Sequence, residues 1–229
     1  MSRRAELARN LAAVEQRLTA ACAAAGRARS EVTLIAVTKT WPASDAAVLR
    51  DLGVADLGEN RDAEARVKAA EVTGVRWHFV GSVQTNKARS VASYADVVHA
   101  LDRLALVEAL AAGARRAGRT VQVLVQVSLD ADPARGGALP QDVPELADAA
   151  AAALGLRLGG VMAVAPRDAD PAEAFARLIE VAEIVRARHP GAAVISAGMS
   201  GDLEQAVSAG ATHVRVGTAL LGARPPASG

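Results

Sequence analysis

The sequence is short of cysteine, of aromatic residues and of any excess charge, and each shortage excludes a class of protein. Cys22 is the only cysteine, which excludes a disulfide scaffold and a zinc site made of several cysteines. Only five residues are Phe, Trp or Tyr, too few for a surface that stacks single-stranded nucleic acid. The 26 Lys and Arg against 25 Asp and Glu leave a net charge of +1, which favours neither a nucleic acid nor an anionic membrane as partner.

Long hydrophobic runs are also missing. No stretch approaches about 18 uninterrupted apolar residues, so we expect no membrane span. Residues 1–26 start with basic side chains, but further charged residues interrupt any signal-peptide core, and we expect a cytoplasmic protein. Four apolar residues of this segment share one helical face: Leu7, Leu11, Val14 and Leu18. We therefore predict an amphipathic helix within residues 1–30.

What is present is mostly alanine and branched aliphatic residues. The apolar fraction is 51%, and 55 residues are alanine. Because Ala has the highest helix propensity, we predict a helix-rich chain with a core of Val, Leu, Ile and Ala. This apolar content excludes disorder. A length of 229 residues suits one large domain or two small ones.

Short β-branched runs alternate with Ala-rich helical stretches along the chain. The runs predict strands at 33–38, 54–58, 76–80, 97–101, 121–127, 158–164, 193–196 and 213–216. The expected helices are 43–52, 61–72, 84–93, 103–117, 141–153, 171–188, 201–209 and a short one from 218. Strict alternation of this kind implies parallel strands joined by right-handed crossovers.

Eight such units can form a closed (β/α)8 barrel or an open doubly wound sheet. The count favours the barrel, and the chain has neither a dinucleotide-binding glycine motif nor a P-loop to support the open sheet. We therefore predict one α/β domain over residues 1–229, a TIM barrel with the N-terminal helix packed on it and a loose tail at 225–229.

Polar residues gather directly after the predicted strands, where a barrel places its active-site loops. Lys39 follows the first strand, on the same face as Ile35 and Val37. A lysine in a barrel mouth loses hydration, which lowers its pKa, and the neutral amine can form a Schiff base with a carbonyl. The alternative is a surface lysine at a strand end.

The ends of the seventh and eighth strands form a second group. Residues 196–202 (SAGMSGD) lead into a predicted helix, whose backbone N–H groups and dipole favour an anion. Gly217 and Thr218 add a glycine that permits close approach and a hydroxyl group. In barrels these two loops often bind phosphate, although an ordinary Gly-rich turn is the alternative.

Arg215 lies within the eighth strand on the same face as Gly217, and a buried guanidinium needs a partner. From position alone we favour an internal salt bridge over a ligand. We interpret His78 as a core residue, and the other histidines show no metal-ligand spacing, so no metal is expected. Three acidic residues are candidate acids or bases, but nothing in the sequence pairs them and we favour loop or capping roles: Glu59, Asp102 and Asp202.

A Schiff-base lysine beside a phosphate site predicts a phosphorylated carbonyl compound as ligand. One class is pyridoxal 5'-phosphate (PLP) held on the lysine, and the other is a sugar phosphate, the substrate of a Schiff-base aldolase. These residues alone leave both classes open.

Six segments, in the same order, resemble the YggS/PROSC family of PLP homeostasis (PLP-binding) proteins. They are AVTKTWP at 36–42, LGENR at 57–61, WHFVGSVQTNK at 77–87, GVMAVAP at 160–166, SAGMSGDLEQAVSAG at 196–210 and VRVGTALLGAR at 214–224. The resemblance covers roughly residues 30–224. Two departures are Arg61, where the family often has Tyr, and the loop SLDADPARGG at 128–137, which lacks the usual Glu and Lys.

The resemblance implies a barrel like the N-terminal domain of bacterial alanine racemase, with PLP as a Schiff base on Lys39. It implies that Arg215 faces the pyridine nitrogen and that Asn60 lies beside the ring. The phosphate would be held by Ser200, Gly217 and Thr218, with Ser196 and Met199 close by. A guanidinium cannot hand a proton to the ring nitrogen, which disfavours carbanion chemistry.

The resemblance also implies a monomeric PLP carrier for intracellular PLP homeostasis, without robust turnover and with PLP-dependent apoenzymes as transient acceptors. The alternatives are a PLP-dependent amino-acid racemase and an aldolase. Racemisation needs a second acid/base, which alanine racemase takes from a separate β-domain. We expect no room for that domain in this sequence, and the only tyrosine, Tyr94, is expected far from the mouth.

Overall fold

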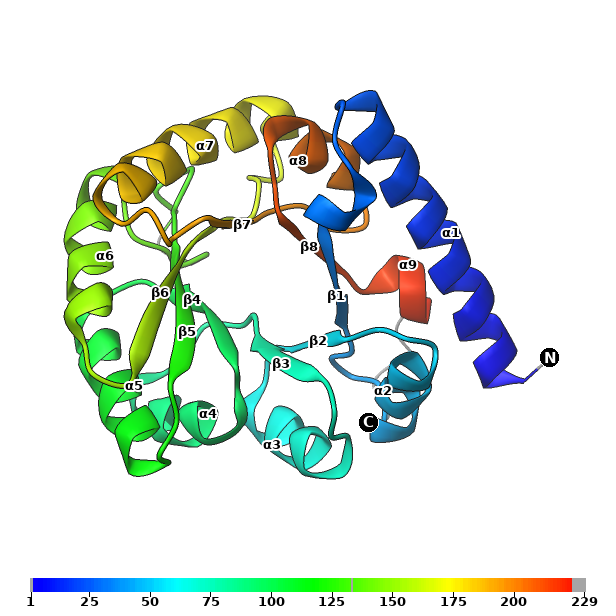
Figure 1. Cartoon of the computed structure of the whole chain (residues 1–229), viewed down its shortest axis with the longest axis horizontal. Coiled ribbons are helices and arrows are strands. Elements are labelled where there is room, and N and C mark those ends of the chain that lie inside the picture. The colour runs from blue at the N-terminus through cyan, green and yellow to red at the C-terminus, as the bar shows by residue number, and fades with distance from the viewer. Residues whose placement is uncertain (1, 133, 224–229) are drawn as a thin grey trace.

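The computed structural model describes residues 2–132 and 134–223, and their eight parallel strands close into a barrel in sequence order. Figure 1 shows the strands as an inner ring with helices around it. The strands are β1 (Thr33–Val37), β2 (Asp56–Glu59), β3 (Arg76–Phe79), β4 (Val97–Leu101), β5 (Val121–Gln126), β6 (Leu156–Met162), β7 (Val194–Ser196) and β8 (His213–Val216). Pairing of β1 with β8 closes the ring and confirms the predicted barrel. The predicted tail at 225–229 lies outside the described residues.

The helices alternate with the strands as predicted. They are α1 (Arg3–Ala24), α2 (Ala43–Asp51), α3 (Asp62–Glu71), α4 (Ala88–Tyr94), α5 (Leu104–Arg116), α6 (Val143–Ala152), α7 (Pro171–Arg188), α8 (Leu203–Ala209) and α9 (Thr218–Leu221). The helix expected at 84–93 is wrong at its start, because residues 85–87 form a 3-10 turn before α4. Thr85 and Asn86 have low helix propensity, which explains the tighter turn.

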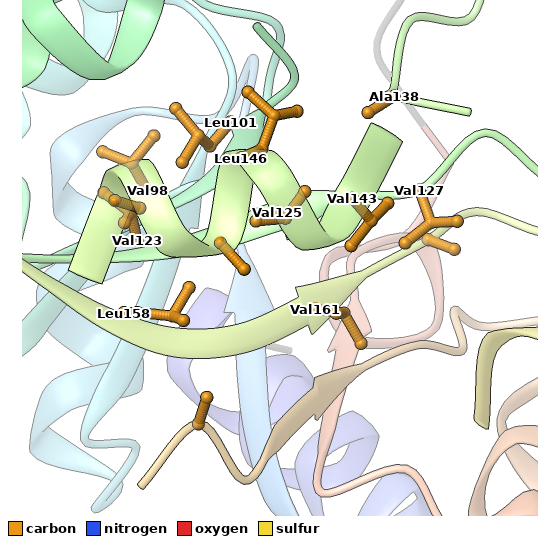
Figure 2. Close-up of a cluster of buried hydrophobic side chains, with 14 of the residues drawn as sticks. Val98, Leu101, Val123, Val125, Val127, Ala138, Val143, Leu146, Leu158 and Val161 are labelled. Carbon is orange, nitrogen blue, oxygen red and sulfur yellow. The ribbon is translucent and has the colours of Figure 1, made fainter. Parts of the chain in front are cut away.

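The main hydrophobic core lies between the barrel and its helices. Figure 2 shows α6 lying over β5 and β6, with Val143 and Leu146 among the side chains of Val123, Val125 and Val161. All five side chains are buried. Burial of apolar area at roughly 25 cal/mol per Å² makes this layer the main source of stability. As expected from the composition, Val, Leu, Ile and Ala supply most of it.

The N-terminal helix α1 is additional to the eight strand–helix units and packs against α2, α8 and α9 (Figure 1). Leu7, Val14 and Leu18 are buried and Leu11 is half-buried, which confirms the predicted apolar face. Arg3 at its start bonds the buried Asp45 carboxylate on α2 at 2.7 Å and lies over the Trp41 ring. Within the described residues, no helix is both long and apolar enough to cross a membrane.

Candidate functional site

The carboxyl ends of the strands bring Lys39, Asn60 and Gly217 to neighbouring positions in the barrel mouth. Val37, the last residue of β1, pairs with Gly58 of β2, and Lys39 and Asn60 each lie two residues further on. On the other side, β1 pairs with β8 up to Val216. A Cβ on Gly217 would lie 3.3 Å from the Val37 carbonyl, so the two strand ends approach closely there. Lys39 is half-buried.

The segment that carries Lys39 is held from outside the barrel by a buried ion pair. Lys68 of α3 donates to Glu59 Oε1 at 2.6 Å and to the Thr38 carbonyl at 2.8 Å. The Thr38 hydroxyl donates to the same Glu59 oxygen at 2.6 Å. Burial raises the pKa of Glu59, although these two hydrogen bonds oppose the shift. This contact anchors the residue directly before Lys39. Glu59 is the last residue of β2, so the loop or capping role expected from the sequence is wrong.

The residue after Lys39 is fixed as well. Thr40 has a φ of 69°, a left-handed conformation that is uncommon for a residue with a branched side chain. Its N–H donates to Glu64 Oε2 of α3 at 3.0 Å. Helix α3 therefore holds the backbone on both sides of Lys39.

Asn60, two residues after the end of β2 that pairs with β1, carries a buried polar atom. Its Oδ1 has no hydrogen-bond partner among the described residues, and a buried acceptor of this kind is costly unless a ligand satisfies it. The loop after β3 packs against Asn60, because a Cβ on Gly81 would lie only 2.4 Å from the Asn60 carbonyl. Gly81 is therefore required for the position of Asn60.

Ser200, Gly217 and Thr218 come together where the loop after β7 meets α9. The Ser200 hydroxyl accepts from the N–H of Ala219, in the first turn of α9, at 3.3 Å. Helix α1 braces both segments, since Arg17 donates to the Ser200 carbonyl at 3.1 Å and Asn10 donates to the Leu220 carbonyl at 2.8 Å.

Met199 lies at the surface, as Thr218 does. Its side chain is exposed and lines a hollow of about 880 Å³ together with Arg135 and Val164. Arg135, in the loop after β5, donates to the carbonyls of Val164 and Ala165 and so ties that loop to the next one. Arg61, which stands where relatives often have Tyr, is exposed and pairs with Glu64 at 3.5 Å.

Arg215 is buried inside the barrel below these loops. It donates to the Ser196 hydroxyl at 2.6 Å and to the Ala163 carbonyl at 2.8 Å. Across the described residues no carboxylate forms a salt bridge with it, so the internal salt bridge favoured from its position is wrong. Burial lowers the pKa of Arg215 to about 10, which leaves the guanidinium charged at neutral pH.

Beneath Arg215, the barrel interior holds further polar residues that the sequence analysis did not connect. Ser196 Oγ lies 3.0 Å from His99 Nδ1, and His99 Nε2 lies 2.9 Å from His78 Nδ1. His78 Nε2 in turn lies 2.8 Å from Asp56 Oδ1. His78 is a satisfied core residue, as predicted.

The electrostatics of this interior favour a neutral His99 ring and an ionised Asp56 carboxylate. Burial is the main cause that lowers the pKa of His99 well below its usual value, and the charges of His78 and Arg215 add to it. Burial alone would raise the pKa of Asp56, but the hydrogen bond and charge of His78 outweigh it and lower that pKa.

Tyr94 and Asp202 lie where the sequence predicts. The Tyr94 hydroxyl donates to Asp62 at 3.2 Å in the outer helix layer, and burial raises its pKa. Asp202 accepts from the Met199 N–H at 2.6 Å, a loop-closing contact. Asp102 forms an ion pair with its neighbour Arg103 at 2.5 Å.

Comparison with known proteins finds relatives of this chain by sequence and by fold. The family model described as alanine racemase, N-terminal domain, matches residues 7–225. A Mycobacterium tuberculosis protein named pyridoxal phosphate homeostasis protein is 45% identical, over 97% of this chain and 94% of its own length. The solved structure of PipY from Synechococcus elongatus with PLP bound is 32% identical, with a TM-score of 0.80 over 94% of this chain and 100% of that chain.

Alanine racemase from Corynebacterium glutamicum shares the fold only. Its sequence is 16% identical and the TM-score is 0.73. The match covers 98% of this chain but 62% of the racemase, so the racemase has a further region with no counterpart in the alignment.

Proposed function

The chain belongs to the alanine racemase N-terminal domain family and, within it, to the pyridoxal phosphate homeostasis proteins, and on this premise we propose that it carries PLP as a Schiff base on Lys39 without robust turnover. Its role is PLP homeostasis, in which it limits the free aldehyde and hands PLP to apoenzymes as transient acceptors. We propose that it does so as a monomer.

Three features of the mouth fit PLP. The buried Asn60 Oδ1 lacks a partner among the described residues, which suits a polar substituent on the cofactor ring. Ser200, Gly217 and Thr218 are small residues gathered at the start of α9, and backbone N–H groups with small polar side chains of this kind suit a phosphate. Arg215 supplies a fixed positive charge at the inner end of the site. The proposal assigns Ser196 to the support of Arg215 and Met199 to the rim.

The choice of lysine carries the proposal. The sequence holds three lysines, at positions 39, 68 and 87. Lys68 is buried in its ion pair with Glu59, and Lys87 is exposed in the turn before α4. Lys39 alone of the three follows a barrel strand at the mouth. A neutral Lys39 amine would attack the aldehyde carbon of PLP, and water would leave as the C=N bond forms.

The permanent charge of Arg215 supports a carrier over an enzyme. PLP supplies an electron sink for carbanion chemistry when its ring nitrogen is protonated. A guanidinium whose pKa is about 10 stays protonated at neutral pH and donates hydrogen bonds without giving up its proton. Arg215 would therefore leave that nitrogen unprotonated, and proton abstraction from a bound amino acid would be slow.

The racemase alternative rests on the shared fold. It needs a second acid/base on the opposite face of the substrate, and the hydroxyl of Tyr94 is engaged with Asp62 between the outer helices. The region of alanine racemase that this chain does not match is also where a further group could come from.

Absorbance spectra of the purified protein with added PLP test the proposal. We expect a band near ~420 nm, typical of PLP bound to a lysine, in the wild type and in Lys87→Ala, but not in Lys39→Ala. A wild type that cannot be loaded with PLP would refute the proposal. Conversion of an L- to a D-amino acid that depends on Lys39 would support the racemase, and a borohydride-trapped sugar phosphate on Lys39 would support the aldolase.

A further inference from the structure

A continuous line of five polar side chains crosses the barrel interior from β2 to β8. The bonds run from Asp56 to His78 at 2.8 Å, to His99 at 2.9 Å, to Ser196 at 3.0 Å and to Arg215 at 2.6 Å. None of the five residues is more than 8% exposed as a whole, and His99 and Ser196 are fully buried. Polar groups this deep in a core are costly unless every one is satisfied, so their arrangement requires an explanation.

Donor and acceptor counting gives this line one direction. The Asp56 carboxylate only accepts, so His78 must donate from Nε2, and a neutral His78 then accepts at Nδ1. His99 must therefore donate from Nε2 and accept at Nδ1, which makes the Ser196 hydroxyl the donor to His99. Ser196 then accepts from Arg215, which can only donate. With both rings neutral, no other assignment satisfies all four bonds.

The two ends of the line carry opposite charges. Arg215 makes no salt bridge to a carboxylate in the described residues, and its other side-chain bond goes to the Ala163 carbonyl. The hydrogen bonds that start at Arg215 end at the Asp56 carboxylate, at the other end of the line. In a medium of low dielectric, bonds aligned in one direction polarise one another, so the carboxylate at one end strengthens the acceptor that faces the cation at the other.

We propose that Asp56, His78, His99 and Ser196 form a one-directional relay that positions the Arg215 guanidinium for the cofactor ring and supplies its distant counter-charge. This inference rests on the proposed function, since it takes PLP as the group that Arg215 faces. The four are positioning residues, because they act on the cofactor only through Arg215.

Other charged groups face the relay and bear on its pH dependence. His213 on β8 has its ring 6.4 Å from that of His78, and Arg76 on β3 lies 3.9 Å from the Asp56 carboxylate. Asp202, in the loop after β7, acts on Arg215 through its charge. One proton added to His78 would make that ring donate from both nitrogens. His99 would then donate to Ser196, and a second positive charge would lie near Arg215.

A matched pair of substitutions separates the relay from a merely structural role. Asp56→Asn removes the charge but keeps an oxygen that can accept from His78. Asp148→Asn makes the same change at a surface pair, where Asp148 also bonds a histidine, His189, at 2.8 Å. We expect Asp56→Asn to weaken PLP binding roughly tenfold, to move the Schiff-base band, and to shift the pH at which that band changes. Asp148→Asn should match the wild type in all three.

The relay can also be tested without a variant and without PLP. Nitrogen-15 NMR of the wild-type protein should find Nε2 protonated on both His78 and His99, and Nδ1 of His99 unprotonated. Protonation of His99 on Nδ1, or equal behaviour of Asp56→Asn and Asp148→Asn, would overturn the inference. If the wild type failed to take up PLP, the proposed function would fail, while the measured tautomers would still decide the direction of the relay.

Discussion

Lys39 and Lys68 carry the same functional group on adjacent segments, but their surroundings give them different roles. Lys68 Nζ is committed to Glu59 and to the Thr38 carbonyl within a buried cluster. Lys39 follows that carbonyl by one residue and stands at the mouth. The buried pair thus fixes the backbone from which Lys39 extends. Lys68 therefore has a structural role, which its position in the sequence does not predict.

Removal of Lys68 tests this role. Lys68→Met would leave the Glu59 carboxylate buried without its cation, so we expect a loss of roughly 3–5 kcal/mol in the free energy of unfolding, measured with urea. The double variant Lys68→Met with Glu59→Gln should recover much of that loss, since the buried charge is removed too. A loss below about 1 kcal/mol in the single variant would show that the pair carries little stability.

His213 should make stability depend on pH. Burial, together with the charge of His78, lowers the pKa of His213 from 6.5 to about 4. Between these two values the unfolded chain binds the proton and the folded chain does not, so the folded state loses stability as the pH falls. Between about pH 7.5 and about pH 5, the free energy of unfolding should fall by roughly 2 kcal/mol more in the wild type than in His213→Asn. Chemical denaturation at the two pH values measures this difference. Equal losses in both proteins would contradict this assignment.

The sequence predicts which polar residues follow the strands, but it does not predict which side chains from different strands meet inside the barrel. Lys39, Asn60, Ser200 and Gly217 are predictable candidates because a barrel collects its strand ends at one face. The link between His99 and Ser196 depends on how β4 and β7 align across the barrel interior. The pairing of β4 with β5 contains a register shift, which no local pattern in the sequence reveals.

At the scale of elements, the alternation of strands and helices is well predicted and their ends less so. All eight strands occur, because β-branched runs between Ala-rich stretches give a strong signal. The second strand, expected at 54–58, begins at Asp56 and extends to Glu59. Its sequence is polar and glycine-containing, so the apolar pattern alone gave a poor boundary. The boundary matters for function, because Asp56 bonds His78 inside the barrel and Glu59 pairs with Lys68 outside it.

Helix α1 acts as a brace for the phosphate region that the proposal assigns to Ser200 and Thr218. Asn10→Ala would remove the hydrogen bond to the Leu220 carbonyl, and we expect a loss of about 1 kcal/mol in the free energy of unfolding. We also expect weaker PLP binding, measured by absorbance titration. Gln16→Ala, on an exposed position of the same helix, is the control. Equal PLP affinity in the two variants would mean that α1 does not support the site.

At the level of the whole molecule, different parts of the barrel supply stability and the proposed function. The helix layer and the outer faces of the strands supply the apolar core, while the mouth gathers the residues proposed to hold PLP. The inside of the strand ring is filled with aliphatic side chains in many barrels. Here it contains the polar line from Asp56 to Arg215. The near-neutral net charge of +1 agrees with a ligand bound by a few local groups and not by a charged surface.

Borohydride reduction of the PLP-loaded protein, followed by peptide mass mapping, identifies the lysine that holds PLP, because reduction makes the bond to that lysine permanent. With lysines only at 39, 68 and 87, the mapping has three possible answers. The account predicts that the pyridoxyl group is found on Lys39 and on neither other lysine. Modification of Lys68 or Lys87 in its place, or no modification of a protein saturated with PLP, would contradict it.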